Sequence, residues 1–446
     1  MALTGRISNS CYNRSTSGRM EQPTPDAVAA ARQKCCKLKP VTAISRATSP
    51  ISVFQHRNFA FVWASTTLVA AGTQMEAVVL GWFVLTLTDS SFLVGLTWTA
   101  RMSLNMLALF AGAIADRVPR HHLLAVVEFM MAVLGLVMLG LIMIGLLEVW
   151  HIFAITVVVG MVRVFQMPSA QSLVADTLPQ NRIGNGAAFN NVGMNIGMLV
   201  GPLVGGALFK AHGPAGAYMA ITALYLLSGL VTLLIKGVGR TTIAKRESVL
   251  RAVIVGLKYV KGEQVLWATL LLAVIIESSG WTFHTSLMPV FARDVLDTDA
   301  AGLGLLMFAF GIGALSGSIG LAMVQNLRHV GKLMILAVVV WHSSILVFAV
   351  SQSFYLSMAI LVVVGGGWAS TQVFLLSALL QTCQSEYRGR VIGLRSLAIY
   401  AFALGSMSSG AMAGLWGAPR AATVVGVMGI ILVITLALFA PKLRRL

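Results

Sequence analysis

Charged residues are scarce in this chain. They make up 11% of its 446 residues, and only 15 residues are acidic, whereas a soluble domain carries roughly 25% charged residues. Hydrophobic residues account for 57% of the chain, and the mean hydropathy is +0.84. This composition excludes the two or three soluble domains that the length alone would suggest. We therefore expect an integral membrane protein.

Cysteine is also scarce. None of the four cysteines, Cys11, Cys35, Cys36 and Cys383, belongs to a C-x-x-C pair or has a histidine nearby at zinc-binding spacing. We expect free thiols, although the adjacent Cys35 and Cys36 could instead be acylated or bind a metal. The motifs G-x-x-x-x-G-K-[ST], H-E-x-x-H and G-x-S-x-G are absent as well. We therefore expect no ATP-driven pump within this chain, no enzyme, no cofactor and no metal.

Long apolar runs dominate what is present. Residues 1–50 are polar, lack an apolar period and predict a disordered tail. Beyond them the sequence predicts twelve membrane-spanning helices, because each apolar run can supply the ~20 residues that cross a bilayer. The expected spans are 59–87, 93–115, 123–146, 150–173, 186–209, 216–235, 265–291, 301–324, 332–350, 353–381, 390–414 and 420–440.

The basic residues lie mainly on one side of these spans. The net charge of +17 could suggest nucleic acid, but the Lys and Arg residues lie in short loops and tails, as membrane topology requires. The loops of the opposite side hold only Lys210, Arg293 and Arg420. We therefore expect a cell-membrane protein with both termini in the cytoplasm and no nucleic-acid partner.

The chain divides into two similar halves. A basic linker over 236–264 separates spans in 51–235 from spans in 265–441, and a basic tail covers 442–446. Val94-Gly95-Leu96 in the first half resembles Leu303-Gly304-Leu305 in the second. Repeats of this kind predict two parallel bundles with a binding site between them, near the bilayer midplane. The expected fold is all-α, with twelve transmembrane helices in two pseudo-symmetric six-helix bundles.

The loop between the second and third spans carries a charged motif. Its sequence, Gly112-Ala-Ile-Ala-Asp116-Arg117-Val-Pro-Arg120, resembles the G-x-L-A-D-R-x-G-R-[KR] signature of the major facilitator superfamily of transporters. It departs from that signature at Pro119 and at the following His121. The resemblance implies a rocker-switch transporter that closes its cytoplasmic mouth with a latch. The expected latch residues are Gly112, Asp116, Arg117, Arg120, Asp176, Arg182, Glu386, Arg388 and Arg390.

A glycine-rich motif in the fifth span resembles the G-x-x-x-G-P-x-x-G-G element of proton-driven antiporters of this superfamily. It consists of Gly197, Gly201, Pro202, Gly205 and Gly206. Glycines four residues apart form a smooth face for close helix contact, and proline permits a bend. The motif therefore predicts tight packing, and the resemblance adds export rather than uptake.

Several charged residues lie inside apolar spans, and four of them are candidates for a central site. A charge near the midplane costs at least ~2.5 kcal/mol and is retained only with a partner or a function. Arg163 and Gln166 resemble the R-x-x-Q of the superfamily's fourth span. The resemblance places Glu76, Arg163 and Glu277 on helices that face the cavity. Arg101 lies at nearly the same depth as Glu76 and is its expected partner. A carboxylate removed from water can act as a proton carrier, although a static ion-pair network is the alternative.

Amide and aromatic side chains at similar depth predict a substrate surface. They suit a large, partly aromatic ligand that forms hydrogen bonds, although such aromatic residues often serve only packing. The candidates are Gln74, Gln166, Trp281, Phe283, His284, Trp368 and Gln372.

Two further segments, His56–Phe59 and the run that begins at Met288-Pro289, resemble the enterobactin-exporter-like branch of the superfamily. This implies a monomer that exports a medium-sized hydrophobic or catecholic molecule, such as a siderophore or a drug, in exchange for protons. Three alternatives remain open: uptake or facilitated diffusion of a small metabolite, lysolipid translocation, and a transporter-like ligand sensor.

Overall fold

The computed structural model describes residues 50–103, 118–236, 249–324 and 329–446. Every regular element within these ranges is a helix. Residues Val53–Leu446 form one compact unit. The predicted tail up to residue 49 and the latch candidates Gly112, Asp116 and Arg117 lie outside the described ranges.

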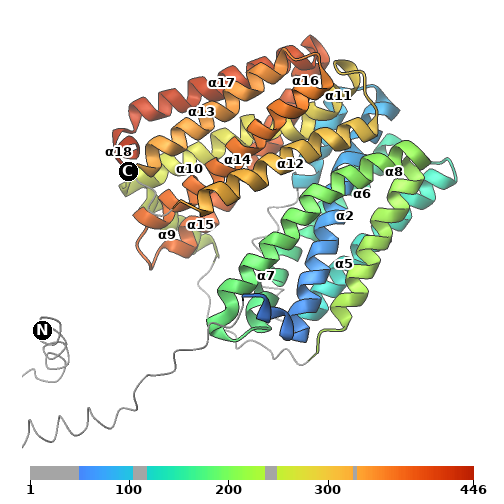
Figure 1. The fold of residues 1–446 in the computed structure, drawn as a ribbon, viewed down its shortest axis with the longest axis horizontal. Helices are drawn as coiled ribbons and strands as arrows, with labels where there is room; N and C mark the ends of the chain where they lie inside the picture. The colour runs from blue at the N-terminus through green and yellow to red at the C-terminus, as the bar shows by residue number, and fades with distance from the viewer. Residues whose placement is uncertain (1–49, 104–117, 237–248, 325–328) are drawn as a thin grey trace, which may run out of the picture. The chain divides into compact units, whose positions relative to one another are not determined.

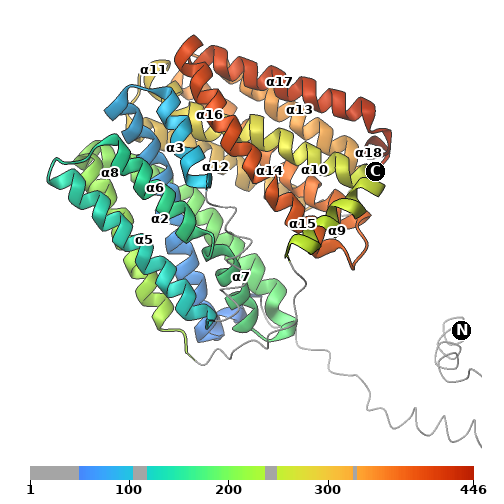
Figure 2. The same cartoon turned by 180° about the vertical axis from the view of Figure 1, so that it is seen from behind.

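The helices group into two bundles (Figures 1 and 2). In the first bundle α2 and α5 both pack against α8, and in the second α14 packs against α12 and α13. After the short helix η1 (Pro50–Gln55), the first bundle contains α2 (Arg57–Thr88), α3 (Ser91–Ser103), α5 (Arg120–Met143), α6 (Val149–Arg163), α7 (Gln166–Asp176), η3 (Gln180–Arg182) and α8 (Ile183–Leu233). The second contains α9 (Val249–Gly262), α10 (Gln264–Ile276), η4 (Glu277–Trp281), η5 (Phe283–Leu287), α11 (Met288–Asp294), α12 (Ala300–Ala322), α13 (Val330–Ala349), α14 (Phe354–Thr382), α15 (Arg388–Leu397), α16 (Ile399–Trp416), α17 (Ala418–Phe439) and α18 (Pro441–Arg445).

Within the described residues, ten helical segments are long and apolar enough to cross a membrane. One of them, Gln180–Leu233, joins two predicted spans across a kink at Gly213, whose φ of 68° and ψ of −170° suit glycine. The second predicted span is described only as α3. The helices are therefore consistent with the predicted twelve.

Two predicted spans are irregular at their centres. The fourth is interrupted between α6 and α7, after Arg163 and before Gln166. The seventh changes from α-helix to π-helix over η4 and η5. Short π segments are uncommon and occur often at functional sites, and both interruptions lie at residues that the sequence singles out.

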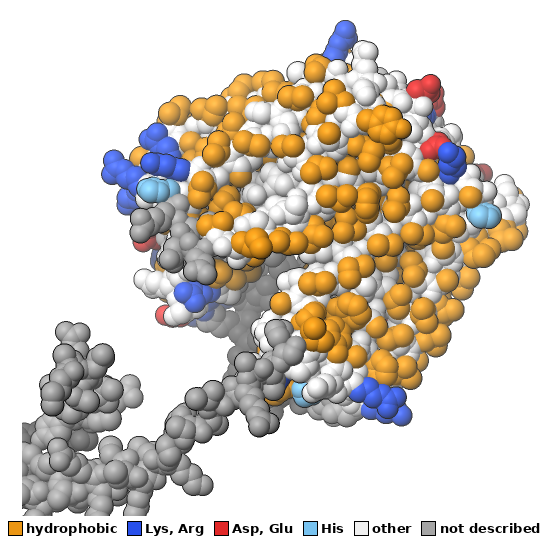
Figure 3. Space-filling view, in the orientation of Figure 1, with side chains coloured by type: hydrophobic (Ala, Val, Ile, Leu, Met, Phe, Trp, Pro, Cys, Tyr) orange, Lys and Arg blue, Asp and Glu red, His pale blue; other side chains and the backbone are white. Residues whose placement is uncertain are grey.

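The bundles meet at the end where the turns between α2 and α3 and between α11 and α12 lie, called here the closed end. Helix α3 crosses α16 where Gly95 and Gly410 let the backbones approach, and Ser91 Oγ donates to the Gly410 carbonyl at 3.2 Å. Arg293 also pairs with Asp89 at 2.7 Å. The other end, which carries α7, α9 and α15, is called the open end, and Figure 3 shows the surface hollowed between the bundles there.

Hydrophobic side chains cover much of the outer surface (Figure 3). The exposed side of α5 presents Val126, Val133 and Leu136, each at least half exposed. Such extensive apolar exposure is unusual for a soluble protein and matches helices that face lipid. Lys and Arg side chains gather instead near the ends of the helices.

Candidate functional site: a central pocket between the bundles

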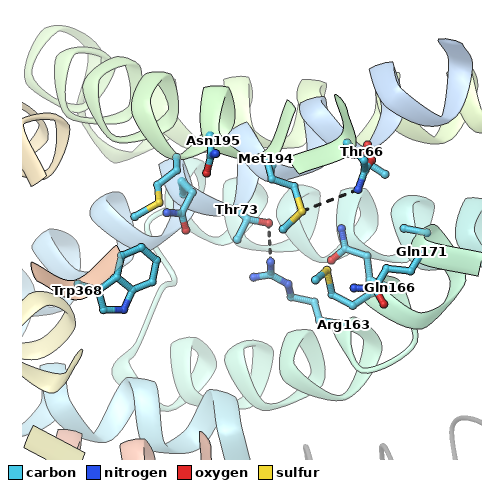
Figure 4. A pocket seen from close by; sticks show the side chains of 14 residues that line it. Thr66, Thr73, Arg163, Gln166, Gln171, Met194, Asn195 and Trp368 are labelled. Atoms are coloured by element: carbon cyan, nitrogen blue, oxygen red, sulfur yellow. Dashed lines mark hydrogen bonds between the residues drawn. The ribbon is translucent and has the colours of Figure 1, made fainter. Parts of the chain in front are cut away.

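A pocket of about 340 Å³ lies between the bundles. Most of its lining comes from α2, α6, α7 and α8, and Trp368 of α14 completes it from the second bundle (Figure 4). Four residues singled out in the sequence line it, namely Gln74, Arg163, Gln166 and Trp368. The other lining residues are Thr66, Ala70, Thr73, Met167, Ala170, Gln171, Asn190, Met194, Asn195 and Met198.

Arg163 is the one charged side chain among the described residues that line the pocket. Its Nη2 donates a hydrogen bond of 2.6 Å to Thr73 Oγ1, as Figure 4 shows. The interruption between α6 and α7 places Arg163 at the end of one helix and Gln166 at the start of the next. Both side chains consequently reach the same space.

Neutral hydrogen-bonding groups supply the rest of the pocket's polarity. Thr66 Oγ1 donates to Asn190 Oδ1 at 2.7 Å, and Gln171 and Asn195 line the same space. Sequence reasoning missed these residues. A usable signal exists in α2, where Thr66, Ala70 and Thr73 recur at helical spacing on one face.

Glu76 lies in a buried cluster beside the pocket. Arg101 Nη2 contacts Glu76 Oε2 at 2.9 Å, and Tyr225 Oη donates to the same oxygen at 2.9 Å. Glu76 is 7% exposed and Arg101 3% exposed. One guanidinium and one hydroxyl of the first bundle therefore compensate the charge of Glu76.

Glu277 occupies a different environment. It is only partly buried and begins the π segment η4. Gln372 acts on its carboxylate by hydrogen bonding and Arg395 by its charge, and Arg395 Nη2 donates to Gln372 Oε1 at 2.7 Å. Arg395 thereby joins α15 to α14 through Gln372.

An aromatic cluster extends the second-bundle side of the pocket. The rings of Trp281 and Trp368 stack with centroids 5.1 Å apart, and the ring centroids of His284 and Phe310 lie 3.9 Å apart. Phe310 was not among the candidates from the sequence. Phe283, also a substrate candidate from the sequence, is fully buried and packs against Phe348. Its place in the structure is helix packing.

The described latch candidates form contacts within each bundle. Arg120 Nη1 pairs with Asp176 Oδ2 at 2.7 Å, which joins α5 to α7. In the second bundle Arg390 lies over the Tyr387 ring, and Arg388 acts by its charge on Cys383. The remaining candidates, Arg182 and Glu386, lie in η3 and in the turn before α15.

The glycine motif of α8 makes two kinds of contact. Gly197, Gly201 and Gly205 face α2, where an added Cβ would meet Ala70, Ala71 and Met75. Gly206 instead lies against the Ala300 carbonyl at the start of α12, and the Pro202 carbonyl approaches Gly304. The motif therefore packs α8 within its own bundle and also against the other bundle.

Comparison with protein families identifies the chain. The profile described as transmembrane secretion effector matches residues 48–445. The chain belongs to this family of major facilitator transporters. No curated protein matches. The resemblance inferred from the sequence motifs is confirmed.

Solved structures with the same fold are also transporters. A bacterial homologue of the human lysosomal transporter Spinster, in an inward-facing and unoccupied conformation, has a TM-score of 0.67, with 14% identity over 87% of this chain and 96% of that chain. The nucleoside transporter NupG has a TM-score of 0.67, with 11% identity over 85% and 98%. A POT family transporter in complex with 5-aminolevulinic acid has a TM-score of 0.71, with 12% identity over 87% and 96%. These similarities show the major facilitator fold, in agreement with the family match.

Proposed function

We propose that the protein exports a medium-sized, partly aromatic small molecule in exchange for protons, by rocker-switch alternating access in the cell membrane. The observation that carries the proposal is the central pocket, which both bundles line beneath a closed end. If both termini are cytoplasmic, as the basic loops favour, the open end faces the cytoplasm. A substrate would then enter the pocket from inside the cell.

The pocket's chemistry suits a molecule with an acidic group and an aromatic part. Within the described residues no carboxylate lies at ion-pair distance from Arg163, whereas Arg101 already pairs with Glu76. A guanidinium binds carboxylate or phosphate oxygens in a fork geometry. Trp368 offers a ring surface on the opposite side, and the amides between them offer donors and acceptors.

Glu277 is the better candidate for carrying the coupled proton. Glu277 is only partly buried and connects to Arg395 through Gln372. Glu76 is enclosed by a guanidinium and a hydroxyl, which suits a structural role. A proton carrier must reach water in at least one state of the cycle, and the partial burial of Glu277 supports this role better than the enclosure of Glu76 does.

The export direction is supported by the family's description and by the glycine motif of α8. The major facilitator fold by itself does not give the direction of transport. Uptake of a small metabolite by the same pocket is therefore the second candidate, and the direction needs a direct measurement.

The experiment compares the small molecules in the medium and in the cell pellet between wild type and a deletion strain. Export predicts compounds that are missing outside and accumulate inside, and that return when the wild-type gene is restored. An Arg163→Met gene should restore them only weakly, because the variant binds the substrate less tightly. Compounds left unused in the medium of the deletion strain would instead establish uptake and overturn the proposed direction.

A further inference from the structure

A second carboxyl group is buried among α2, α5 and α8, away from the residues that line the pocket. Glu128 of α5 is 1% exposed. Around it lie Ser65 of α2 and Ser228 and Thr232 of α8, all fully buried. Nothing in the transport proposal uses this group.

The oxygen atoms form a closed ring. Ser65 Oγ lies 2.6 Å from Glu128 Oε1, and Thr232 Oγ1 lies 2.6 Å from Glu128 Oε2. Ser65 Oγ and Thr232 Oγ1 lie 2.8 Å apart, which closes the ring. Ser228 Oγ approaches the Ser65 hydroxyl at 3.2 Å and the Ser65 carbonyl at 3.1 Å.

The number of hydrogens in the ring depends on the state of the carboxyl group. The two ring hydroxyls bring one hydrogen each, but the ring has three short oxygen contacts. If Glu128 is ionised, Ser65 and Thr232 both donate to it, and no ring hydrogen remains between their own oxygens. A carboxylic acid supplies the third hydrogen: Glu128 donates to Thr232, Thr232 to Ser65, and Ser65 to the other oxygen of Glu128.

No positive charge compensates an ionised Glu128 within the described part of the chain. The groups that act on it are the hydroxyls of Ser65, Thr232 and Ser228. A buried charge without a partner costs several kcal/mol. The other titratable residues of the neighbouring helices either contact groups other than Glu128 or lie at other positions along those helices. They are Arg57, Glu76, Arg120, His121, His122, His151, Arg163, Asp176, Lys210, His212, Tyr218 and Tyr225.

We propose that Glu128 is a proton-binding site, occupied in this conformation by a proton that the hydroxyl ring of Ser65 and Thr232 holds. Loss of the proton would place an uncompensated charge between three packed helices. Release therefore requires α2, α5 and α8 to shift relative to one another, which ties the proton to a change of conformation. That coupling role rests on the proposed proton-driven transport, whereas the bound proton does not.

Infrared spectroscopy of the purified protein tests the bound proton. At neutral pH, Glu128→Gln should remove one carboxylic-acid C=O band from the wild-type spectrum. The matched control is Glu148→Gln, because Glu148 is exposed in the turn after α5 and should leave that band unchanged. Thr232→Val removes a ring member and should shift the band. The proposal would be overturned if Glu128→Gln left the carboxylic-acid band unchanged. It would also be overturned if the substitution removed a carboxylate band from the wild-type spectrum instead.

The coupling role is tested in cells by the set of compounds that wild type releases and the deletion strain does not. Glutamine mimics the neutral acid, because its amide can donate to Thr232 and accept from Ser65. Glu128→Gln should reach the membrane in normal amount and lose that release. Release at the wild-type rate would overturn the coupling role. If wild type and deletion strain do not differ, the transport proposal fails, while the infrared band still decides whether Glu128 holds a proton.

Discussion

In the first bundle Glu76 is enclosed by Arg101 and Tyr225, whereas in the second bundle Glu277 remains partly exposed and interacts with Arg395 through Gln372. Both carboxylates lie in apolar helices at comparable predicted depth. This difference supports the proposal that Glu76 joins helices and that Glu277 exchanges the coupled proton. Four predictions test this comparison, the pocket and the closed end.

The largest effect is expected from removing the partner of Glu76. Arg101→Ala leaves a buried carboxylate without its guanidinium, and breaking a buried pair in this way costs about 3–5 kcal/mol. We expect a large fall in thermal stability in detergent and a small yield of folded protein. Unfolding followed by tryptophan fluorescence measures the change.

The control for this prediction is the double variant Glu76→Gln with Arg101→Gln. It removes both charges and should recover much of the stability, because neither charge is then left alone. Equal instability of the single and double variants would show that the helices depend on the shape of the Arg101 side chain rather than on the ion pair.

Changing Glu277 should affect coupling more than stability. Glu277→Gln keeps the shape and the hydrogen bond with Gln372 but cannot release a proton. We expect transport driven by a pH gradient to be lost in proteoliposomes, while substrate exchange without a gradient continues. Glu76→Gln is the matched variant, and it should lower stability instead. Wild-type pH dependence in Glu277→Gln would exclude this residue as the proton carrier.

Much of the fold follows from residue patterns. The predicted spans 59–87 and 353–381 match α2 at Arg57–Thr88 and α14 at Phe354–Thr382, because long apolar runs between charged loops leave few alternatives. The π segment at Glu277 has no comparable signal, since it depends on how α10 packs against neighbouring helices. Gly280, for example, has no room for a Cβ beside Trp341.

The candidate site was only partly predictable for a related reason. Arg163 and Glu76 stand out because a charge in an apolar span is costly. Asn190 and Thr66 carry no such signal, and only the packing of α2 against α8 brings them together. Glu128 was missed although it is also a charge in an apolar span, and its hydroxyl partners lie far away in sequence on other helices.

An intermediate effect is expected at the pocket's charged residue. Arg163→Met removes the guanidinium but keeps an apolar side chain of similar length. A hydrogen bond to a charged group contributes about 1.5–3 kcal/mol, so KM for an acidic substrate should rise by roughly ten-fold to a hundred-fold. Transport kinetics of the compound released by wild type give this value.

Arg163→Lys is the control, since it keeps the charge but not the fork geometry and should fall between wild type and Arg163→Met. A neutral substrate should respond weakly to both changes. Equal KM values in all three proteins would remove Arg163 from the binding site and leave it a helix contact with Thr73.

The smallest effect is expected at the closed end, where Asp299 joins α12 to Lys210 of α8 at 2.8 Å. Burial alone would raise the pKa of Asp299, but the bonds from Lys210 and from the Gly302 N–H outweigh it and lower that pKa. A carboxyl group with a lowered folded-state pKa stabilises the structure above its unfolded pKa, and this contribution is lost as the pH falls through the folded value. The bond is partly exposed, so its contribution is small and weakens with salt. Asp299→Asn should therefore slightly lower stability at neutral pH and make no difference in strong acid.

Cysteines placed across α8 and α12 should cross-link less readily in Asp299→Asn than in the otherwise wild-type protein at low salt. Identical cross-linking in the two proteins would show that the glycine contacts, Gly206 on Ala300 and Gly304 on Pro202, hold the closed end without the ion pair.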